Sequence, residues 1–217
     1  MVKKQVISMW IDFTSAYSYL AYTNLKKVLN QTKRYDLIIE LKSYQMLPDF
    51  DSQNSHQVQG FKKLLHDDQK TFENPKLTQM LKSNGLKLEF KNVKPLNTID
   101  AHQLLHLAKT LDPSFDLTND LARVFFLNYW SKNKNLASES ELLKISHGAG
   151  IEQKLVKEVF ATNDYLKAVF LDEQEGINQD IQGVPFIVFP NQEKLLGTCS
   201  VEQLKRIIRE IKLIDEN

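Results

Sequence analysis

Hydroxyl side chains gather near the N-terminus, where the sequence pattern changes from strand to helix. Residues 5–11 have the apolar pattern of a buried strand, and a helical pattern runs from Ser15 to about residue 29. The first turn of a helix has backbone N–H groups without partners and the positive end of the helix dipole. A hydroxyl or thiolate at Ser15 would therefore lie where negative charge is favoured. The alternative is that Thr14 or Ser15 serves only as an N-cap.

A second candidate position is Pro185, which follows Gly183 and Val184 at the start of an apolar strand. A cis peptide bond occurs at only about 5 to 6% of X-Pro bonds in folded proteins. From these residues alone, a trans proline that begins a strand is the favoured interpretation.

Histidine and cysteine offer little for metal or thiol chemistry. His102 and His106 are four residues apart on one predicted helix, so they could face one metal ion, but no third ligand is evident nearby. They could equally flank the buried face of that helix. Cys199 is the only cysteine, which rules out a disulfide within the chain. If Cys199 lies at the N-terminus of the last helix, the pKa of its thiol would be lowered. The alternative, which is the favoured one, is that Cys199 is a small semi-buried residue.

The composition is that of an ordinary globular protein. Of the 217 residues, 42% are hydrophobic and 25% are charged, and the net charge is +1. This composition excludes a disordered chain, and the charge balance provides no field that would attract nucleic acid or an anionic membrane. We find neither a signal peptide nor a membrane-spanning run, so we expect a cytoplasmic protein.

The predicted elements give an α/β fold. Strands are expected at 5–11, 37–41, 184–189 and 194–196, and a final helix at 201–213. Helical periodicity dominates from 56 to 176, apart from a β-rich run at 86–90. Helices are predicted near residues 57–72, 75–83, 98–111, 115–132, 138–148, 151–160 and 163–176. This order suggests a thioredoxin-like core, a βαβ unit plus a ββα unit, with a large all-helical insertion. We assign residues 1–55 and 177–217 to the core and 56–176 to the insertion.

Three segments, in this order, resemble the DsbA-like branch of the thioredoxin superfamily, and in particular its FrnE-type dithiol-disulfide isomerases. Residues 12–20 (DFTSAYSYL) lie where that family has Asp-Phe-x-Cys-Pro-Trp-Cys-Tyr-Ile. Residues 97–108 (NTIDAHQLLHLA) resemble the family's Asn-Thr-x-x-Ala-His-Arg-Leu-x-His-Leu-Ala helix, and residues 183–185 its Gly-Val-Pro segment. The resemblance covers almost the whole chain and weakens the metal interpretation, so we expect no metal.

The resemblance implies a site at the start of the first helix. Pro185 would be cis and face Ser15, with the Val184 backbone free to pair with an extended, thiol-bearing ligand. Thr14 and Tyr17 would line the same site. Ser15 and Ser18 occupy the positions of both redox cysteines, so we take them as the catalytic candidates, and dithiol exchange lacks both of its thiols. A helix terminus contributes at most about 2 kcal/mol, which activates a thiol but leaves an alcohol neutral.

Three functions remain open at this stage. The first is a DsbA/FrnE-type oxidoreductase homologue that has lost dithiol exchange. The second is a glutathione-dependent transferase or isomerase in which Ser15 donates a hydrogen bond to the thiolate, because residues 15–20 also resemble the junction of kappa-class glutathione transferases and 2-hydroxychromene-2-carboxylate isomerases, with Ala16 in place of a proline. The third is a non-enzymatic, protein-binding adaptor.

These interpretations share their partners. We expect a thiol-bearing small molecule or an extended peptide as the ligand, and no nucleic acid or membrane. No cofactor is expected beyond glutathione as a co-substrate in the second interpretation, and a homodimer is left open.

Overall fold

A computed structural model of the chain describes residues 3–51 and 53–214. Its four-stranded sheet has the order β2-β1-β3-β4. The central strand β1 (Gln5–Ile11) runs parallel to β2 (Leu37–Ser43) and antiparallel to β3 (Phe186–Val188), which forms an antiparallel hairpin with β4 (Lys194–Leu196). The predicted α/β class and the shared sheet of a βαβ unit and a ββα unit are therefore confirmed.

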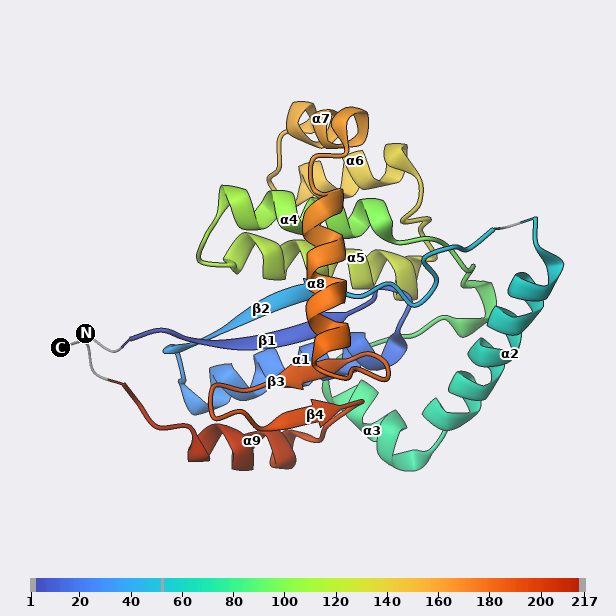
Figure 1. Ribbon diagram of the computed structural model, residues 1–217. Helices are drawn as coiled ribbons and strands as arrows, with labels where there is room; N and C mark the ends of the chain where they lie inside the picture. The colour runs from blue at the N-terminus through green and yellow to red at the C-terminus, as the bar shows by residue number, and fades with distance from the viewer. Residues whose placement is uncertain (1–2, 52, 215–217) are drawn as a thin grey trace.

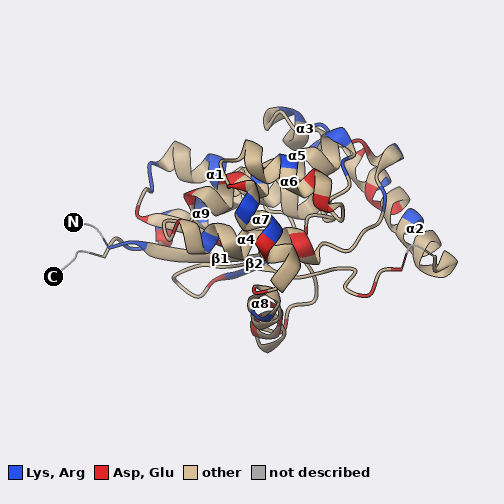
Figure 2. Cartoon of the chain, turned by 90° about the horizontal axis from the view of Figure 1, so that it is seen from above, with Lys and Arg blue, Asp and Glu red and all other residues tan. Residues whose placement is uncertain are grey.

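Helices cover both faces of this sheet. Figures 1 and 2 show α1 (Ala16–Thr32) and α9 (Val201–Glu210) on one face and α8 (Leu166–Asn178) across the other. Alternation along β1 matches this arrangement, because side chains of a strand point to opposite faces in turn. Ile7 and Met9 are fully buried in the core that α1 and α9 share, whereas Trp10 packs with Ile181 and Phe186 on the α8 side.

The helices between β2 and β3 comprise an outlying pair, which comes first in the chain, and a bundle beside the sheet (Figure 1). Their bounds are α2 (Ser55–Phe72), α3 (Pro75–Ser83), the short 3-10 helix η1 (Phe90–Asn92), α4 (Ile99–Leu111), α5 (Asp116–Lys132), α6 (Glu139–Gly148) and α7 (Gln153–Thr162), followed by α8. Helices α4 and α5 pack on each other, α5 also contacts β2, and α6 and α7 lie beyond α4. One apolar cluster runs from β1 through α1 into α4 and α5, so the bundle and the sheet share a core.

The elements differ from the predicted ones in one run and in several bounds: α8 begins at Leu166 and not at residue 163, and β3 spans only Phe186–Val188 of the predicted 184–189. The β-rich run at 86–90 forms no strand: the Glu89 N–H donates to the Trp130 carbonyl at 2.8 Å, so this backbone bonds to α5 and not to a sheet. The last helix ends at Glu210, short of the predicted residue 213. Helix α8 contacts β2 as well as α4, and the assignment of residues 56–176 to an insertion stays a prediction.

The described helices contain no stretch that is both long and apolar enough to cross a bilayer.

Candidate functional site

Ser15 is the N-cap of α1. The strand β1 ends at Ile11, the chain turns, and Ser15 takes an extended conformation (φ −94°, ψ 110°) directly before the first helical residue. Its Oγ accepts a hydrogen bond from the Ser18 N–H at 3.1 Å. The N-cap interpretation is therefore confirmed, and the hydroxyl that caps the helix is also the one that the sequence predicts to act on a ligand.

The segment before β3 faces this helix end. The Val184–Pro185 peptide bond is cis, in contrast to the trans form that the residues alone favour. The Ser15 hydroxyl donates to the Val184 carbonyl at 3.3 Å, a contact between residues 169 positions apart. The structure thus brings Ser15 together with Val184 and Pro185, as the resemblance predicts. Their role toward a ligand stays a prediction.

Asp12 fixes the turn from which Ser15 projects. Its Oδ1 accepts the Thr14 N–H at 3.0 Å, its Oδ2 accepts the Met46 N–H, and its carbonyl accepts the Ser15 N–H at 3.1 Å. The side chain is fully buried, and burial raises its pKa, although the hydrogen bonds from Met46 and Thr14 act in the opposite direction. Asp12 thereby ties the loop after β2 to the start of α1. Asp12 belongs to the motif at residues 12–20, but no local pattern indicates its contact with Met46, 34 positions away.

The remaining predicted residues around Ser15 differ in their exposure and in their contacts. Thr14 and Ser18 are buried, and no described residue provides a hydrogen-bond partner for either hydroxyl oxygen. Tyr17 is partly exposed, and its ring centroid lies 4.9 Å from that of Phe72 in α2. Ser15 itself is 3% exposed, so only a small part of its surface is open to a ligand.

This arrangement can bind negative charge without a metal ion. The N–H groups of Ala16 and Tyr17 point from the first turn of a 17-residue helix and have no partner among the described residues. Together with the hydroxyls of Ser15 and Thr14 they provide donors at the positive end of a helix dipole. A neutral alcohol at Ser15 can donate one hydrogen bond to an anion, but it cannot attack a disulfide.

Cys199 takes no part in this site. It is 2% exposed, and burial raises the pKa of its thiol to about 12, so the interpretation that placed an activated thiol here is wrong. Its carbonyl accepts a hydrogen bond from Asn24 Nδ2 at 2.9 Å. Asn24 is nine residues after Ser15, or about 13 Å along the helix axis. The alternative of a small semi-buried cysteine is therefore the correct one, and Cys199 is more fully buried than predicted.

The two histidines have separate surroundings. His102 is fully buried beside Phe13, both of its ring nitrogens lack a partner among the described residues, and burial lowers its pKa to about 3. His106 Nε2 lies 3.1 Å from Asp172 Oδ2. Within the described residues no three His, Cys, Asp or Glu side chains form a group suited to a metal ion.

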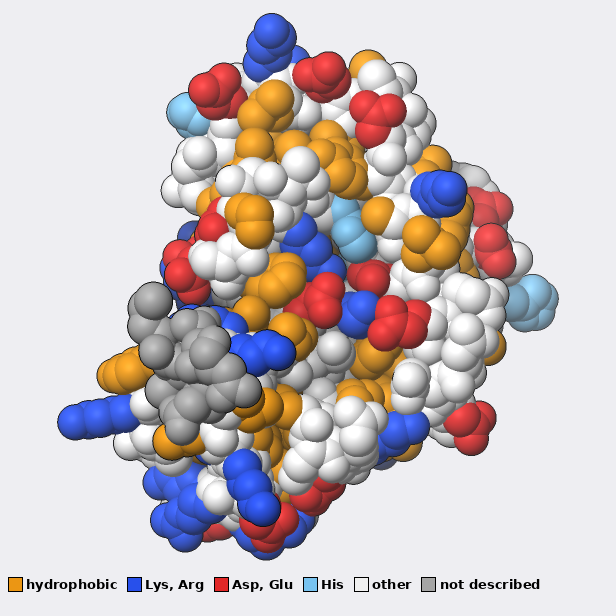
Figure 3. All heavy atoms as spheres, turned by 60° about the vertical axis from the view of Figure 1, so that its left-hand side comes forward, with side chains coloured by type: hydrophobic (Ala, Val, Ile, Leu, Met, Phe, Trp, Pro, Cys, Tyr) orange, Lys and Arg blue, Asp and Glu red, His pale blue; other side chains and the backbone are white. Residues whose placement is uncertain are grey.

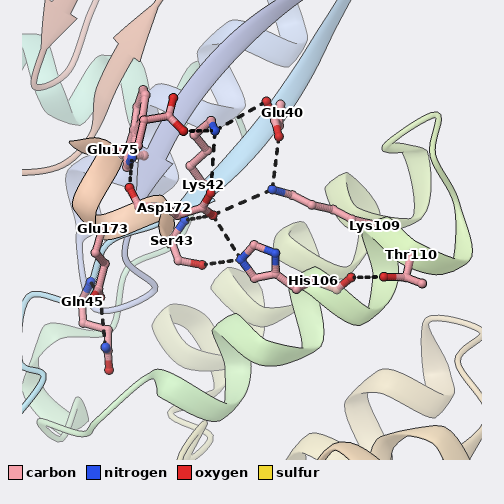
Figure 4. A network of polar contacts seen from close by, with 11 residues as sticks. Glu40, Lys42, Ser43, Gln45, His106, Lys109, Thr110, Asp172, Glu173 and Glu175 are labelled. Carbon is pink, nitrogen blue, oxygen red and sulfur yellow. Dashed lines mark hydrogen bonds and ion pairs between the residues drawn. The ribbon is translucent and has the colours of Figure 1, made fainter. Parts of the chain in front are cut away.

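A charged network that the sequence analysis misses joins β2, α4 and α8 (Figure 4). Lys42 Nζ lies 2.7 Å from Glu175 Oε2 and 3.7 Å from Asp172 Oδ1, and Lys109 Nζ lies 3.5 Å from Glu40 Oε1. Figure 3 shows acidic, basic and histidine side chains meeting near the middle of the face that it draws. The residues of this network are far apart in sequence, so no local motif predicts it.

The same network contains a Ser, a His and an Asp, but their geometry does not form a proton relay. Ser43 Oγ lies 3.3 Å from His106 Nε2, and Asp172 Oδ2 lies 3.1 Å from the same nitrogen. A catalytic triad needs the serine and the carboxylate on opposite ring nitrogens. The network is therefore a connection between elements and not a second nucleophilic site.

The fold agrees with comparisons to known proteins. Three solved structures are similar over nearly their whole length: a probable DsbA oxidoreductase from Streptomyces coelicolor, 2-hydroxychromene-2-carboxylate isomerase, and the cytosolic disulfide reductase DsbM from Pseudomonas aeruginosa with GSH. Their TM-scores are 0.81, 0.65 and 0.64, and their identities 21%, 17% and 13%. The alignments cover 97%, 94% and 94% of this chain and 94%, 93% and 97% of the other.

A search of the curated proteins found no match. The profile of the DSBA-like thioredoxin domain, in contrast, matches residues 6–209. That span begins in β1, includes every helix between the two halves of the sheet and ends in α9. The chain therefore belongs to the DSBA-like thioredoxin domain family.

Proposed function

We propose that this chain is a member of the family that no longer carries out dithiol-disulfide exchange. The observation that carries the proposal is the site itself: Ser15 and Ser18 stand at the start of α1 opposite Pro185, and the sole thiol, Cys199, is buried elsewhere with its pKa raised to about 12. Disulfide exchange needs a thiolate that can reach its target. Neither an alcohol at Ser15 nor the thiol at Cys199 meets that requirement.

Reduction of insulin by dithiothreitol tests this proposal. We expect the wild type and Cys199→Ala to leave the rate at background, and the double variant Ser15→Cys/Ser18→Cys to accelerate it, because this change restores a Cys-x-x-Cys pair at a helix N-terminus. The double variant is the matched control, since it shows whether the site around Ser15 still accepts a disulfide substrate. Reductase activity of the wild type that survives Cys199→Ala would contradict the proposal.

A second function, binding of glutathione as its thiolate, is favoured by the donors around Ser15. The Thr14 and Ser18 hydroxyl oxygens are buried without described partners, and the Ala16 and Tyr17 N–H groups are free within the described residues. The Ser15 hydroxyl donates to the Val184 carbonyl over a long distance of 3.3 Å. A thiolate could replace that carbonyl as the acceptor with little loss of free energy, because a hydrogen bond to a charged acceptor is stronger. One structural neighbour, the cytosolic disulfide reductase DsbM, was solved with GSH, which supports such a ligand.

Titration of reduced glutathione, followed by NMR, tests this second function. We expect saturable binding at millimolar concentration that weakens about tenfold in Ser15→Ala, since a hydrogen bond to a charged group contributes about 1.5 kcal/mol or more. S-methylglutathione, which has no thiolate, should bind the wild type and Ser15→Ala equally. Absence of binding would exclude glutathione as the ligand. An extended peptide as ligand, or a protein-binding adaptor, would then be the functions to test.

DsbM is a cytosolic protein, which supports a cytoplasmic location as part of this proposal.

A further inference from the structure

The outward side of α8 is apolar and exposed. Figure 2 shows this helix standing out from the rest of the molecule, on the face of the sheet that lies away from α1. Phe170, Leu171 and Ile177 are 53%, 59% and 62% exposed. Single exposed apolar side chains are common, but a set of three within about two turns of one helix is typical of an interaction surface.

Contacts on the inner side of α8 fix which of its residues point outward. Val169, Asp172 and Gly176 are buried. Trp10 Nε1 donates to the Asp172 carbonyl at 2.8 Å, and a Cβ added to Gly176 would lie 3.1 Å from the same nitrogen. The helix therefore packs closely on the Trp10 ring through its one glycine, and this packing sets its rotation about its own axis. Phe170, at a position on the opposite side of α8, stays at the surface.

The sheet beneath α8 exposes further apolar side chains on the same face. Directly paired residues of neighbouring strands point to the same side, so the register Trp10–Phe186–Leu196 places all three on the α8 side. Trp10 and Phe186 are buried, but Leu196 is 57% exposed. Val6, four positions before Trp10 on β1, points to the same side and is 40% exposed. This face is thus incompletely covered, whereas Ile7 on the other face is fully buried.

The order of charges along α8 favours a second copy of the chain as the occupant of this surface. The outward side of the helix has one charged residue, Lys167, in its first turn, and Asp180 is exposed just past its C-terminal end. Two antiparallel α8 helices can be related by a two-fold axis that passes between positions 173 and 174. This axis places Lys167 opposite Asp180 and Phe170 opposite Ile177, each twice. The two helix dipoles then also run in opposite directions.

The other charges near α8 do not oppose this pairing. Glu173 accepts hydrogen bonds from Gln45, and Glu175 pairs with Lys42, so both carboxylates have partners within the chain. Asp164 precedes the helix and lies three positions farther from the axis than Lys167 does. The net charge of +1 gives little repulsion between two copies. An unrelated partner would need its own acid and base in the matching order, which a second copy supplies by symmetry.

We propose that two copies of this chain associate through their α8 helices, arranged antiparallel about a two-fold axis. Phe170 of each copy packs against Ile177 of the other, and Lys167 of each copy pairs with Asp180 of the other. This surface contains none of the predicted site residues around Ser15, so the proposal does not depend on the proposed function.

Sedimentation equilibrium of the full chain, from about 5 to about 200 µM, tests the proposal. We expect a mass that rises with concentration toward twice 25.2 kDa, with a dissociation constant in the micromolar range. Phe170→Ser should raise this constant at least about tenfold, because the centre of the interface loses its aromatic side chain. Leu111→Ser, at a 45% exposed leucine on α4, is the matched control and should leave it unchanged. Ser15→Ala should associate like the wild type.

Charge reversal identifies the partner as a second copy. Lys167→Glu and Asp180→Lys each place like charges opposite one another, so each variant alone should associate at least about fivefold more weakly than the wild type. In an equimolar mixture of the two variants, every such contact again joins opposite charges, so association should recover. Recovery also shows that both variants fold. A wild type that stays monomeric to about 200 µM, a dissociation constant that Phe170→Ser leaves unchanged, or a mixture that associates no better than its components would overturn the proposal.

Discussion

At the scale of single residues, Ser15 combines a structural and a chemical task. Its Oγ accepts the Ser18 N–H, which stabilises the start of α1. Its proton is directed at the Val184 carbonyl, so the same hydroxyl can donate to a ligand atom that takes the place of that carbonyl oxygen. A cysteine side chain at this position would retain the chemistry of the family, whereas serine retains the cap. The proposed loss of exchange chemistry would therefore leave the helix start in place.

The capping role predicts the stability of the Ser15 variants. Ser15→Ala should lower the free energy of unfolding by about 1 kcal/mol, because one N–H of the first turn of α1 loses its partner. Ser15→Thr retains a hydroxyl at the N-cap and should lose less stability than Ser15→Ala. Urea denaturation at pH 7 measures both. An unchanged midpoint for Ser15→Ala would show that the cap contributes nothing.

The contrast between local and distant contacts also explains how much of the site is predictable from sequence. The strand, the helix start and the N-cap depend on neighbouring residues, so the pattern around Ser15 indicates them directly. The contacts from Asp12 to Met46 and from Trp130 Nε1 to the Phe13 carbonyl span 34 and 117 positions. No local spacing encodes such pairs, and only the resemblance places Pro185 opposite Ser15.

At the scale of elements, Asp172 connects α8 to β2 and α4. Its Oδ2 accepts the Ser43 N–H at 2.8 Å and lies 3.1 Å from His106 Nε2. Burial raises the pKa of Asp172, but the hydrogen bond from His106, the Lys109 charge and the Ser43 N–H outweigh it, so its pKa is below its usual value. The carboxylate is thus ionised at neutral pH and satisfies groups on both β2 and α4.

Removal of this carboxylate should loosen the contact of α8 with the sheet. Asp172→Asn should lower the free energy of unfolding at pH 7 by about 2 kcal/mol, because Lys42 and Lys109 each lose one carboxylate, while keeping Glu175 and Glu40, and the buried bonds to Ser43 and His106 lose their charge. Glu175→Gln, at a side chain that is 47% exposed, should cost less than about 1 kcal/mol and serves as the control. Hydrogen exchange should show faster opening of α8 in Asp172→Asn alone.

The pH dependence of Asp172→Asn follows from the direction of the pKa shift. A carboxyl whose pKa is lower in the folded state contributes stability above about pH 4, and this contribution is lost as the pH falls through the folded value. The difference in stability between the wild type and Asp172→Asn should therefore shrink on acidification below about pH 4. A difference that is constant from pH 7 to pH 3 would contradict this assignment of the charge.

At the scale of the whole molecule, Cys199 reports on opening of the shared core. The thiol is buried at the start of α9, and its neighbour Asn24 joins α1 to α3 through a hydrogen bond from Asn84 Nδ2 at 2.7 Å. A thiol reagent can reach Cys199 only when these helices separate. Labelling by a thiol reagent at pH 8 should therefore be at least about a thousandfold slower for the native chain than for the unfolded chain.

The raised pKa of Cys199 adds a dependence on alkaline pH. Because its pKa is about 12 when folded and about 8.5 when unfolded, the thiol contributes stability that is present below about pH 8.5 and is lost as the pH rises toward the folded value. Relative to Cys199→Ala, the wild type should therefore lose stability between about pH 8.5 and pH 10. Rapid labelling of the native chain, with no such alkaline loss, would mean that Cys199 is accessible, and one-thiol chemistry would then return as an explanation of what this family member does.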